Sequence, residues 1–198
     1  MKKIMFNDKY GLTRAVLEGR KTQTRRIAYT GNATIIDCGI CVEPKNIGRA
    51  ILLRGIDEVA YSRYNVGEEV AIAQAYCELV SEVGINEAEI NKLRNSKGWT
   101  NKMFVKDDLM PHRIRITDIR AERLQEISDE DCIAEGIKKN PEVLRGMWEF
   151  SYIKDVTLKF EMSTTTRGAY AKLIDHISGK GTWASNPYVF VYEFELIK

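Results

Sequence analysis

The segment 17–27 carries the residues of this chain that are best suited to chemistry. It holds, at short fixed intervals, Gly19, Lys21, Thr24 and Arg26. A lysine that lies beside a second cation and is partly desolvated has a pKa below its usual value of about 10.4. The neutral amine of Lys21 can then act as a base towards the Thr24 hydroxyl and make it a nucleophile. Cations and hydroxyls on an extended segment also suit a polar, anionic or nucleoside-like ligand. The alternative is a solvated basic turn stabilised by the dipole of the preceding helix.

Local patterns predict the elements that position these groups. An apolar stripe that includes Leu12 and Val16 predicts a helix over residues 8–18, and Gly19 is placed to end it in a left-handed conformation. Hydroxyl and β-branched residues over 22–27 favour a strand, with Thr24 and Arg26 on one face. Lys21 lies at the joint, where its long side chain can reach the pocket of Thr24.

A carboxylate further along the chain is the third candidate. Ser128 and Asp131 approximate a capping box, which predicts a helix that begins at Asp129 and ends at Gly136. Glu135 then lies in the last turn, where the helix dipole disfavours an anion by about 0.3–1 kcal/mol. A carboxylate in an unfavourable place points to function. The alternative is an exposed surface residue, or one that pairs with a nearby arginine.

The pattern Gly-x-Lys-x-x-Thr-x-Arg resembles the signature of the ASCH family, a branch of the PUA-like β-barrels associated with RNA and nucleoside binding. Other stretches are similar to successive blocks of ASCH-like proteins of bacteria and their phages, at 66–70, 116–127, 129–137 and 181–191. Many strands with a few helices indicate an α+β domain built on a mainly antiparallel barrel. The resemblance narrows this to a PUA-like barrel with flanking helices, as a single domain over 1–198. Insertions are expected near 28–63, 80–98 and 138–165.

Some small ASCH proteins are amidohydrolases that remove the acetyl group from N4-acetylcytidine with a lysine, a threonine and a glutamate. The resemblance places these roles on Lys21, Thr24 and Glu135. It implies that Thr24 is the nucleophile and Lys21 its activator, while Glu135 handles the proton or orients the substrate amine. No cofactor is implied.

Further residues are candidates for ligand binding. Gly19 shapes the turn, and Arg25 and Arg26 belong to the basic cluster that any nucleic-acid role must use. Aromatic rings such as Tyr76 and Trp183 offer stacking surfaces for a base. Relatives commonly carry an Arg-Glu pair where this chain has Ala73 and Gln74, so the pocket is expected to bind something different here.

These observations support two main hypotheses from different classes. The first is a module that binds RNA or a modified nucleoside or nucleotide at the barrel mouth without chemistry. The second is an amidohydrolase that acts on N4-acetylcytidine or a related amide. An interaction domain with a vestigial pocket is a third alternative.

Composition limits the remaining possibilities. With 198 residues, 44% of them hydrophobic, the chain can bury one sizeable core, and its net charge of +2 is too small to indicate nucleic-acid binding by itself. No apolar run is long enough for a membrane span or a signal peptide, so a cytoplasmic protein without membrane contact is expected. No obligate protein partner can be inferred. Cys38 and Cys41 have the spacing of half a zinc site, but two free thiols are preferred and no metal is expected.

The periodicity also predicts the order of the elements. Strands are expected near 2–6, 22–27, 50–53, 68–79, 102–105, 112–124 and 188–197, and helices near 8–18, 86–95, 129–135 and 167–178. In a regular strand Ile119 would lie on the opposite face to Ile114 and Ile116, which predicts a bulge near 117–118.

Overall fold

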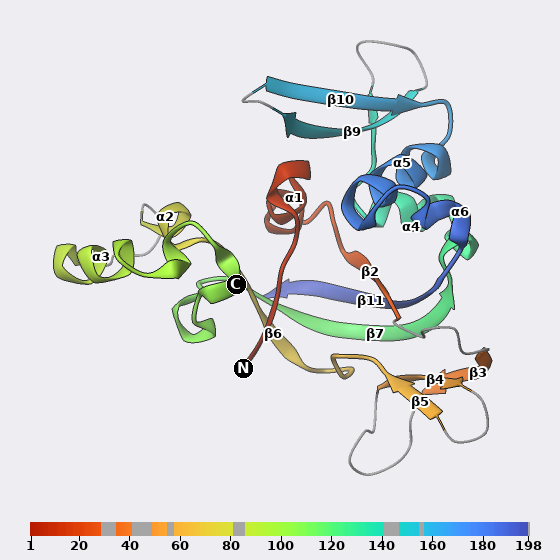
Figure 1. Cartoon of the computed structure of the whole chain (residues 1–198), viewed down its shortest axis with the longest axis horizontal. Helices are drawn as coiled ribbons and strands as arrows, with labels where there is room; N and C mark the ends of the chain where they lie inside the picture. Colours follow the sequence, from red (N-terminus) through yellow and green to blue (C-terminus); the bar gives the residue numbers. More distant parts are fainter. Residues whose placement is uncertain are drawn as a thin grey trace.

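A five-stranded mixed sheet forms the centre of the molecule (Figure 1). The computed structural model describes residues 1–28, 35–40, 49–54, 58–80, 86–140, 147–154 and 157–197. The strand order is β1-β6-β7-β11-β2, in which only β1 and β6 run parallel. The strands are β1 (Lys2–Ile4), β2 (Gln23–Ile27), β6 (Glu69–Ile72), β7 (Arg113–Arg123) and β11 (Tyr188–Ile197).

The prediction of a PUA-like barrel is wrong. In the described part of the chain the fold is α+β, and no sheet closes on itself. The central sheet ends at β1 on one side and at β2 on the other. Near these edges the Arg26 guanidinium donates to the Met5 carbonyl at 2.5 Å, so a side chain rather than a backbone ladder joins the two segments. A barrel would require continuous strand pairing at this place.

Two further sheets of three strands accompany the central one. One has the order β3-β4-β5 and comprises β3 (Ile35–Ile40), β4 (Ala50–Arg54) and β5 (Glu58–Tyr61). The other has the order β10-β9-β8 and comprises β8 (Lys138–Asn140), β9 (Met147–Lys154) and β10 (Thr157–Ser163). Both lie in the insertions expected near 28–63 and 138–165, and in Figure 1 they project from opposite sides of the central sheet.

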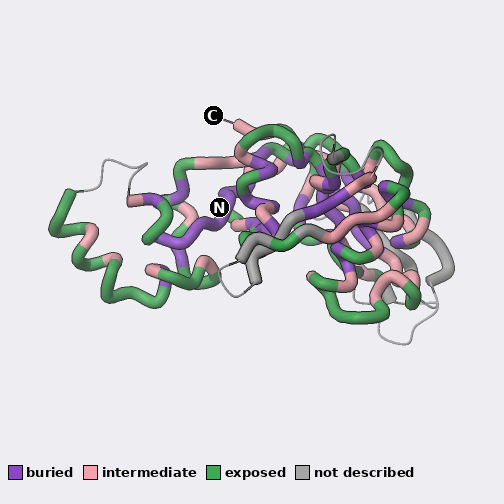
Figure 2. Tube along the Cα trace, turned by 90° about the horizontal axis from the view of Figure 1, so that it is seen from above, coloured by how far each residue is buried: buried purple, intermediate pink, exposed green. Residues whose placement is uncertain are grey.

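Helices on one side of the central sheet enclose the main core. They are α1 (Leu12–Leu17), α4 (Asp129–Ala134), α5 (Thr166–Ser178) and α6 (Thr182–Ser185). Ile114 and Ile116 of β7, Val191 of β11 and Tyr170 of α5 are among the buried members of this core. Figure 2 shows the buried chain concentrated in this part of the molecule.

A helical lobe extends from the sheet after β6 (Figures 1 and 2). It contains α2 (Tyr76–Leu79), α3 (Glu87–Arg94) and 3-10 turns at Lys97–Trp99, Lys102–Phe104 and Asp107–Leu109. The strand predicted over 68–79 is therefore wrong in part, because it ends at Ile72. The strand predicted over 102–105 is wrong, because a 3-10 turn lies there. After β6 ends at Ile72, the Ala75 backbone N–H donates to the Glu78 carboxylate, and this bond caps the helix α2 that begins at Tyr76.

Several local predictions are confirmed. Ser128 caps α4 by accepting from the Asp131 N–H, and Gly19 has a φ of 72° directly after α1. The helix expected over 8–18 is divided at Gly11, whose φ of 64° separates a 3-10 turn at Asp8–Tyr10 from α1. The bulge near 117–118 is present as well, because β11 pairs Glu193 with Asp118 and the next residue with Ile116.

Candidate functional site

Backbone hydrogen bonds place the segment of Lys21 against the end of α4. After the left-handed turn at Gly19, the Lys21 N–H donates to the Ala15 carbonyl of α1. The next residue, Thr22, donates its N–H to the Ala134 carbonyl at 3.0 Å. The second contact joins residues that are more than a hundred positions apart in the chain, so it brings Lys21 and the end of α4 into one site.

Lys21 and Glu135 form a buried ion pair. The Lys21 amine lies 2.5 Å from Glu135 Oε2, and the two side chains are only 1% and 6% exposed. The same amine donates to the Gln23 carbonyl at 2.8 Å and to the Glu135 carbonyl at 2.9 Å. All three donors of an ammonium are thus satisfied. Burial lowers the pKa of Lys21, and the charge of Glu135 opposes this shift only in part.

The same contacts explain why an anion is tolerated at the end of α4. Glu135 is the C-terminal cap of this helix, followed by Gly136 with a φ of 109°. Its backbone carbonyl, which the helix leaves without a partner, accepts the bond from Lys21. Lys21 therefore compensates both the carboxylate and the negative end of the helix dipole.

Arg25 holds the other oxygen of this carboxylate. Its guanidinium lies 3.3 Å from Glu135 Oε1, 2.7 Å from Glu122 and 2.5 Å from Asp131, and it also donates to Gln23 Oε1. Burial alone would lower the pKa of Arg25, but the neighbouring carboxylates raise it above its ordinary value. The side chain has no exposed surface. Arg25 was expected to bind ligand, and the structure places its charge among protein carboxylates instead.

A wider polar layer supports Arg25. Arg120 pairs with Glu122 at 2.9 Å, Asp131 at 2.7 Å and Glu193 at 2.5 Å. The Gln23 amide nitrogen donates to Asp131 and Glu193, both at 3.1 Å. Burial would raise the pKa of Asp131, but the bond from Arg25 holds it below the ordinary value. The two arginines are thus shared among carboxylates from β7, α4 and β11, which fixes the position of Glu135.

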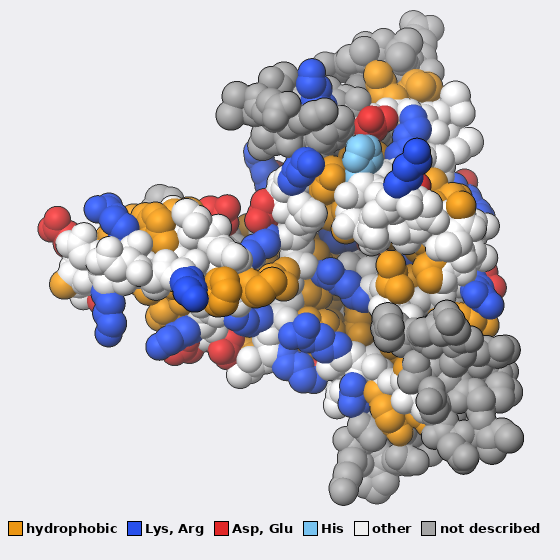
Figure 3. All heavy atoms as spheres, in the orientation of Figure 1, with side chains coloured by type: hydrophobic (Ala, Val, Ile, Leu, Met, Phe, Trp, Pro, Cys, Tyr) orange, Lys and Arg blue, Asp and Glu red, His pale blue; other side chains and the backbone are white. Residues whose placement is uncertain are grey.

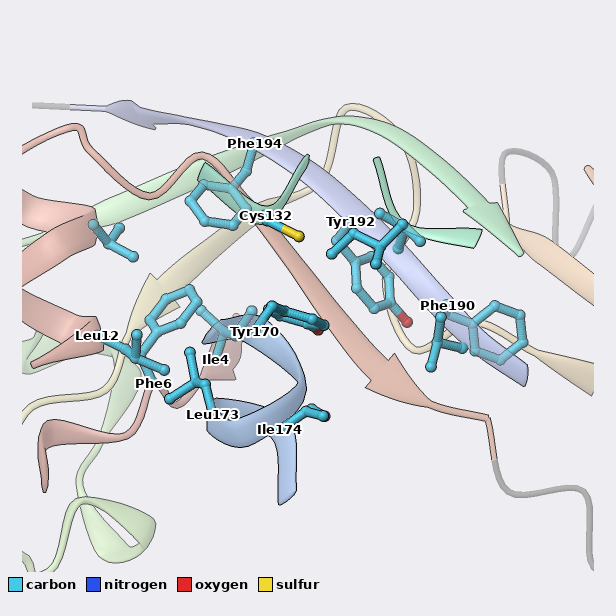
Figure 4. Close-up of a cluster of buried hydrophobic side chains, with 14 of the residues drawn as sticks. Ile4, Phe6, Leu12, Cys132, Tyr170, Leu173, Ile174, Phe190, Tyr192 and Phe194 are labelled. Carbon is cyan, nitrogen blue, oxygen red and sulfur yellow. The ribbon is translucent and has the colours of Figure 1, made fainter. Parts of the chain in front are cut away.

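A pocket of about 170 Å³ opens beside the ion pair, and we call it the Thr24 pocket. Its polar wall is formed by Lys21, Thr24, Arg25, Arg26 and Glu135. Its apolar wall is formed by Phe6, Leu12 and the α5 residues Tyr170, Leu173, Ile174 and Ile177. Figure 4 shows the labelled members of the apolar wall, with α5 facing Phe6 and Leu12. The candidate residues of the first segment and Glu135 therefore meet at one cavity.

Two hydroxyls in this pocket lack a hydrogen-bond partner in the described part of the chain. Within the described residues, neither Thr24 Oγ1 nor the Tyr170 hydroxyl makes a hydrogen bond, although Thr24 is only 4% exposed and Tyr170 only 2%. Burial, with the Glu135 charge adding to it, raises the pKa of Tyr170 well above its ordinary value, so the phenol remains a proton donor. Both hydroxyls are available to a bound molecule.

Tyr170 is the residue that sequence reasoning missed. It shares a helical stripe with Leu173, Ile174 and Ile177, and a stripe of this kind is typical of a core face. Nothing in that spacing distinguishes the tyrosine from its apolar neighbours. The carboxylates of Glu122 and Asp131, which bind Arg25, were missed as well. Their pairing with Arg25 depends on the tertiary fold and leaves no pattern in the sequence.

Three of the predicted binding residues lie away from the Thr24 pocket. Gln74 is buried in the smaller core of the helical lobe, and its Oε1 has no partner among the described residues. Tyr76 accepts a hydrogen bond from the Lys106 N–H and lines a different cavity of about 630 Å³. Trp183 packs edge-on against the Tyr170 ring at 6.2 Å, so it supports α5 from the outer side.

The described residues give no metal site and no membrane-spanning segment. They contain no group of three or more His, Cys, Asp or Glu side chains placed to hold a metal ion. Cys41 and the side chain of Cys38 lie outside the described residues. Among the helices of the described ranges, none has both the length and the apolar character needed to cross a membrane.

The arrangement as a whole combines a pocket, a buried lysine–carboxylate pair and an unbonded threonine hydroxyl, so it can bind a small polar molecule and move a proton. Comparison of the chain with family models, with curated proteins and with solved structures finds no match.

Proposed function

We propose that this protein is an amidohydrolase that removes the acyl group from a small amide of the N4-acetylcytidine type. One observation carries the proposal: the Thr24 hydroxyl has no hydrogen-bond partner among the described residues and lines the same pocket as the buried Lys21–Glu135 pair. A nucleophile beside a base that is held by a third group is the arrangement expected for covalent catalysis. The resemblance of the Gly19 to Arg26 segment to ASCH amidohydrolases supports the same assignment.

The proposed reaction assigns one step to each of these groups. Thr24 Oγ1 attacks the acyl carbon, and its proton passes to the neutral Lys21 amine, while Glu135 holds the proton that Lys21 has given up. The amide C–N bond then breaks as the leaving amine takes up a proton from Lys21. Water hydrolyses the acyl ester of Thr24, which releases a carboxylic acid and restores the hydroxyl. The short distance of 2.5 Å between amine and carboxylate supports proton exchange between them.

The size of the pocket limits what can enter it. At about 170 Å³ it is smaller than the roughly 300–1,000 Å³ typical of sites for drug-sized ligands. An acyl group and the amide it carries fit this space better than a complete nucleotide. The apolar wall suits the acyl chain, and the polar wall suits the amide.

Binding of a nucleoside without chemistry is the second candidate, and one observation favours it. The Lys21 amine already makes three hydrogen bonds, as a charged and purely structural ammonium would. In that case Thr24 and Tyr170 would only recognise the ligand.

The two candidates are separated by incubating purified protein with N4-acetylcytidine and following cytidine and acetate by mass spectrometry. Amidohydrolase activity predicts release of both products and, in samples quenched early, an acyl group on the peptide that contains Thr24. Thr22→Ala is the matched control, because Thr22 is an exposed neighbour that does not line the pocket. If the parent protein binds cytidine but releases no acetate, the binding candidate replaces the enzyme.

We expect kcat/KM for this substrate to rise with pH through the pKa of Lys21. The protonated amine, which dominates below that pKa, cannot accept the Thr24 proton, whereas the neutral amine above it can. Because burial lowers the pKa of Lys21, the rise is centred below the ordinary value of about 10.4. Initial rates measured between about pH 6 and about pH 10 test this, with circular dichroism to exclude unfolding. Rates that fall across this range would remove Lys21 as the base.

Replacing Tyr170 with phenylalanine is expected to lower kcat/KM by up to about tenfold. The phenol can donate to the oxygen that gains charge when Thr24 attacks, and a neutral hydrogen bond contributes about 0.5–1.5 kcal/mol. The substitution keeps the ring and therefore its contact with Trp183. Tyr188→Phe, on β11 and outside the pocket, is the control. Equal rates for Tyr170→Phe and the parent would show that the hydroxyl takes no part.

A further inference from the structure

A second pocket adjoins the Thr24 pocket across strand β2. It has a volume of about 470 Å³ and is lined by residues of β1, β2, β5 and β11 and by Arg63 and Tyr64; we call it the Arg63 pocket. Arg26 and Ile27 line both pockets, so the two pockets meet along this strand. Figure 3 shows Lys and Arg side chains beside hydrophobic ones in the middle of this face.

Two cations in this pocket, Arg26 and Arg63, make no ion pair among the residues that the structure describes. Lys3 also lines the pocket, but its amine is directed at the helical lobe, where it donates to the backbone carbonyls of Met103 and Val105. Arg26 donates to the Met5 carbonyl and lies 5.9 Å from the centre of the Phe6 ring. Arg63 lies over the Tyr64 ring at 5.6 Å.

The neighbouring arginines of the central sheet are arranged differently. Arg25, Arg115 and Arg120 each pair with at least two carboxylates. Among the described residues, no Asp or Glu lines the Arg63 pocket. Cations gathered without anions repel one another, so the arrangement is favourable when an anion binds between them.

Aromatic rings form a fixed wall next to these cations. The Tyr64 hydroxyl donates to the Lys3 carbonyl at 2.8 Å, and the Tyr192 hydroxyl accepts from the Arg63 N–H at 2.9 Å. The two rings meet edge to face at 5.2 Å. Both side chains are therefore held in place before a ligand arrives. A rigid aromatic wall beside cations suits a molecule that has a planar or sugar part and a negative charge.

We propose that the Arg63 pocket holds the phosphate of a nucleotide substrate whose acylated base enters the Thr24 pocket. This rests on the proposed role of the Thr24 pocket as the site of the reacting amide. The two pockets divide the ligand by chemistry: the uncharged amide meets Thr24 and Tyr170, and the phosphate meets Arg26 and Arg63. A phosphorylated nucleoside is then preferred to the free nucleoside. The phosphate can belong to a mononucleotide or to a strand.

The test measures binding by isothermal titration calorimetry and so does not depend on hydrolysis. The probes are cytidine, cytidine 5′-monophosphate and a trinucleotide with a central cytidine. We expect the parent to bind the monophosphate at least about tenfold more tightly than cytidine, the effect of one hydrogen bond to a charged group. This preference should decrease as the salt concentration rises. Tighter binding of the trinucleotide than of the monophosphate, with a steeper salt dependence, assigns the phosphate to a strand, and the reverse order assigns it to a free nucleotide.

Two substitutions locate the effect. Arg63→Gln and Arg26→Gln should each reduce the preference for the monophosphate over cytidine to less than about threefold. Arg115→Gln is the matched control, because Arg115 pairs with Glu69 and Glu195 away from the pocket, and it should keep the preference. Equal binding of cytidine and its monophosphate by the parent would overturn the proposal, as would an unchanged preference in both pocket variants. Acetate release without a phosphate preference would refute the phosphate subsite but not the amidohydrolase activity. A phosphate preference without acetate release would refute the activity but not the subsite.

Discussion

Lys21→Met lowers the free energy of unfolding by about 3–5 kcal/mol, the usual cost of removing one partner from a buried ion pair. Methionine approximates the length of lysine, so the loss arises from charge rather than from volume. The buried carboxylate of Glu135 would retain only the longer contact of 3.3 Å with Arg25. The carbonyls of Gln23 and Glu135 would also lose their donor. Urea denaturation followed by circular dichroism measures the change.

Two variants control this experiment. The paired substitution Lys21→Met with Glu135→Leu should recover much of the loss, because no buried charge is then left without its partner. Arg14→Gln breaks the exposed pair with Glu18, where the arginine side chain is 83% exposed, and should cost less than about 1 kcal/mol. A Lys21→Met variant as stable as Arg14→Gln would contradict the assignment of a structural role to the buried pair.

Thr24→Ala and Glu135→Gln should each reduce kcat for N4-acetylcytidine by two or more orders of magnitude, which corresponds to about 3 kcal/mol of barrier. The first removes the nucleophile, and the second keeps the size of the side chain but removes its ability to exchange a proton with Lys21. Because the groups act as one unit, the double variant should be little slower than either single one. Single-turnover kinetics measures the chemical step.

Folding must be checked in each of these variants, and Thr22→Ala serves again as the exposed threonine control. If the effects of Thr24→Ala and Glu135→Gln multiply in the double variant, the two residues act independently and the proposed proton path is wrong. Undiminished turnover in Thr24→Ala would exclude it as the nucleophile.

Much of the local structure around the site is predictable because its causes are local. The Ser128 cap, the left-handed Gly19 and the bulge opposite Glu193 each depend on a few neighbouring residues, and the structure contains all three. The meeting of Lys21 with Glu135 is not local, and its expectation came from a resemblance rather than from spacing. Sequence reasoning gave no distance for that pair, and it did not find the carboxylates that hold Arg25.

The barrel was predicted wrongly because the alternation of apolar and polar residues along single strands does not determine whether the two edges of a sheet pair with each other. The pattern in β7 and β11 is the same whether the outer strands meet or remain apart. Closure depends on contacts between the edges, and here Arg26 and Met5 provide a side-chain contact instead of a ladder. The helix near 86–95 was predicted correctly, but the early end of β6 and the helix α2 were missed, because alanines over 71–75 suit a strand and the bond from the Ala75 N–H to Glu78 is not evident from the alternation.

The burial of Arg25 also determines the alignment of strand β2. Among the described strands this one pairs with β11 alone, with Arg25 opposite Val191, so a single described ladder specifies its position. A shift by one residue would exchange the two faces of the strand. It would turn Arg25 away from Glu122 and Asp131 and leave those carboxylates without their shared cation. Arg25 therefore fixes the register of this edge strand and keeps Thr24 directed at the same point in the pocket.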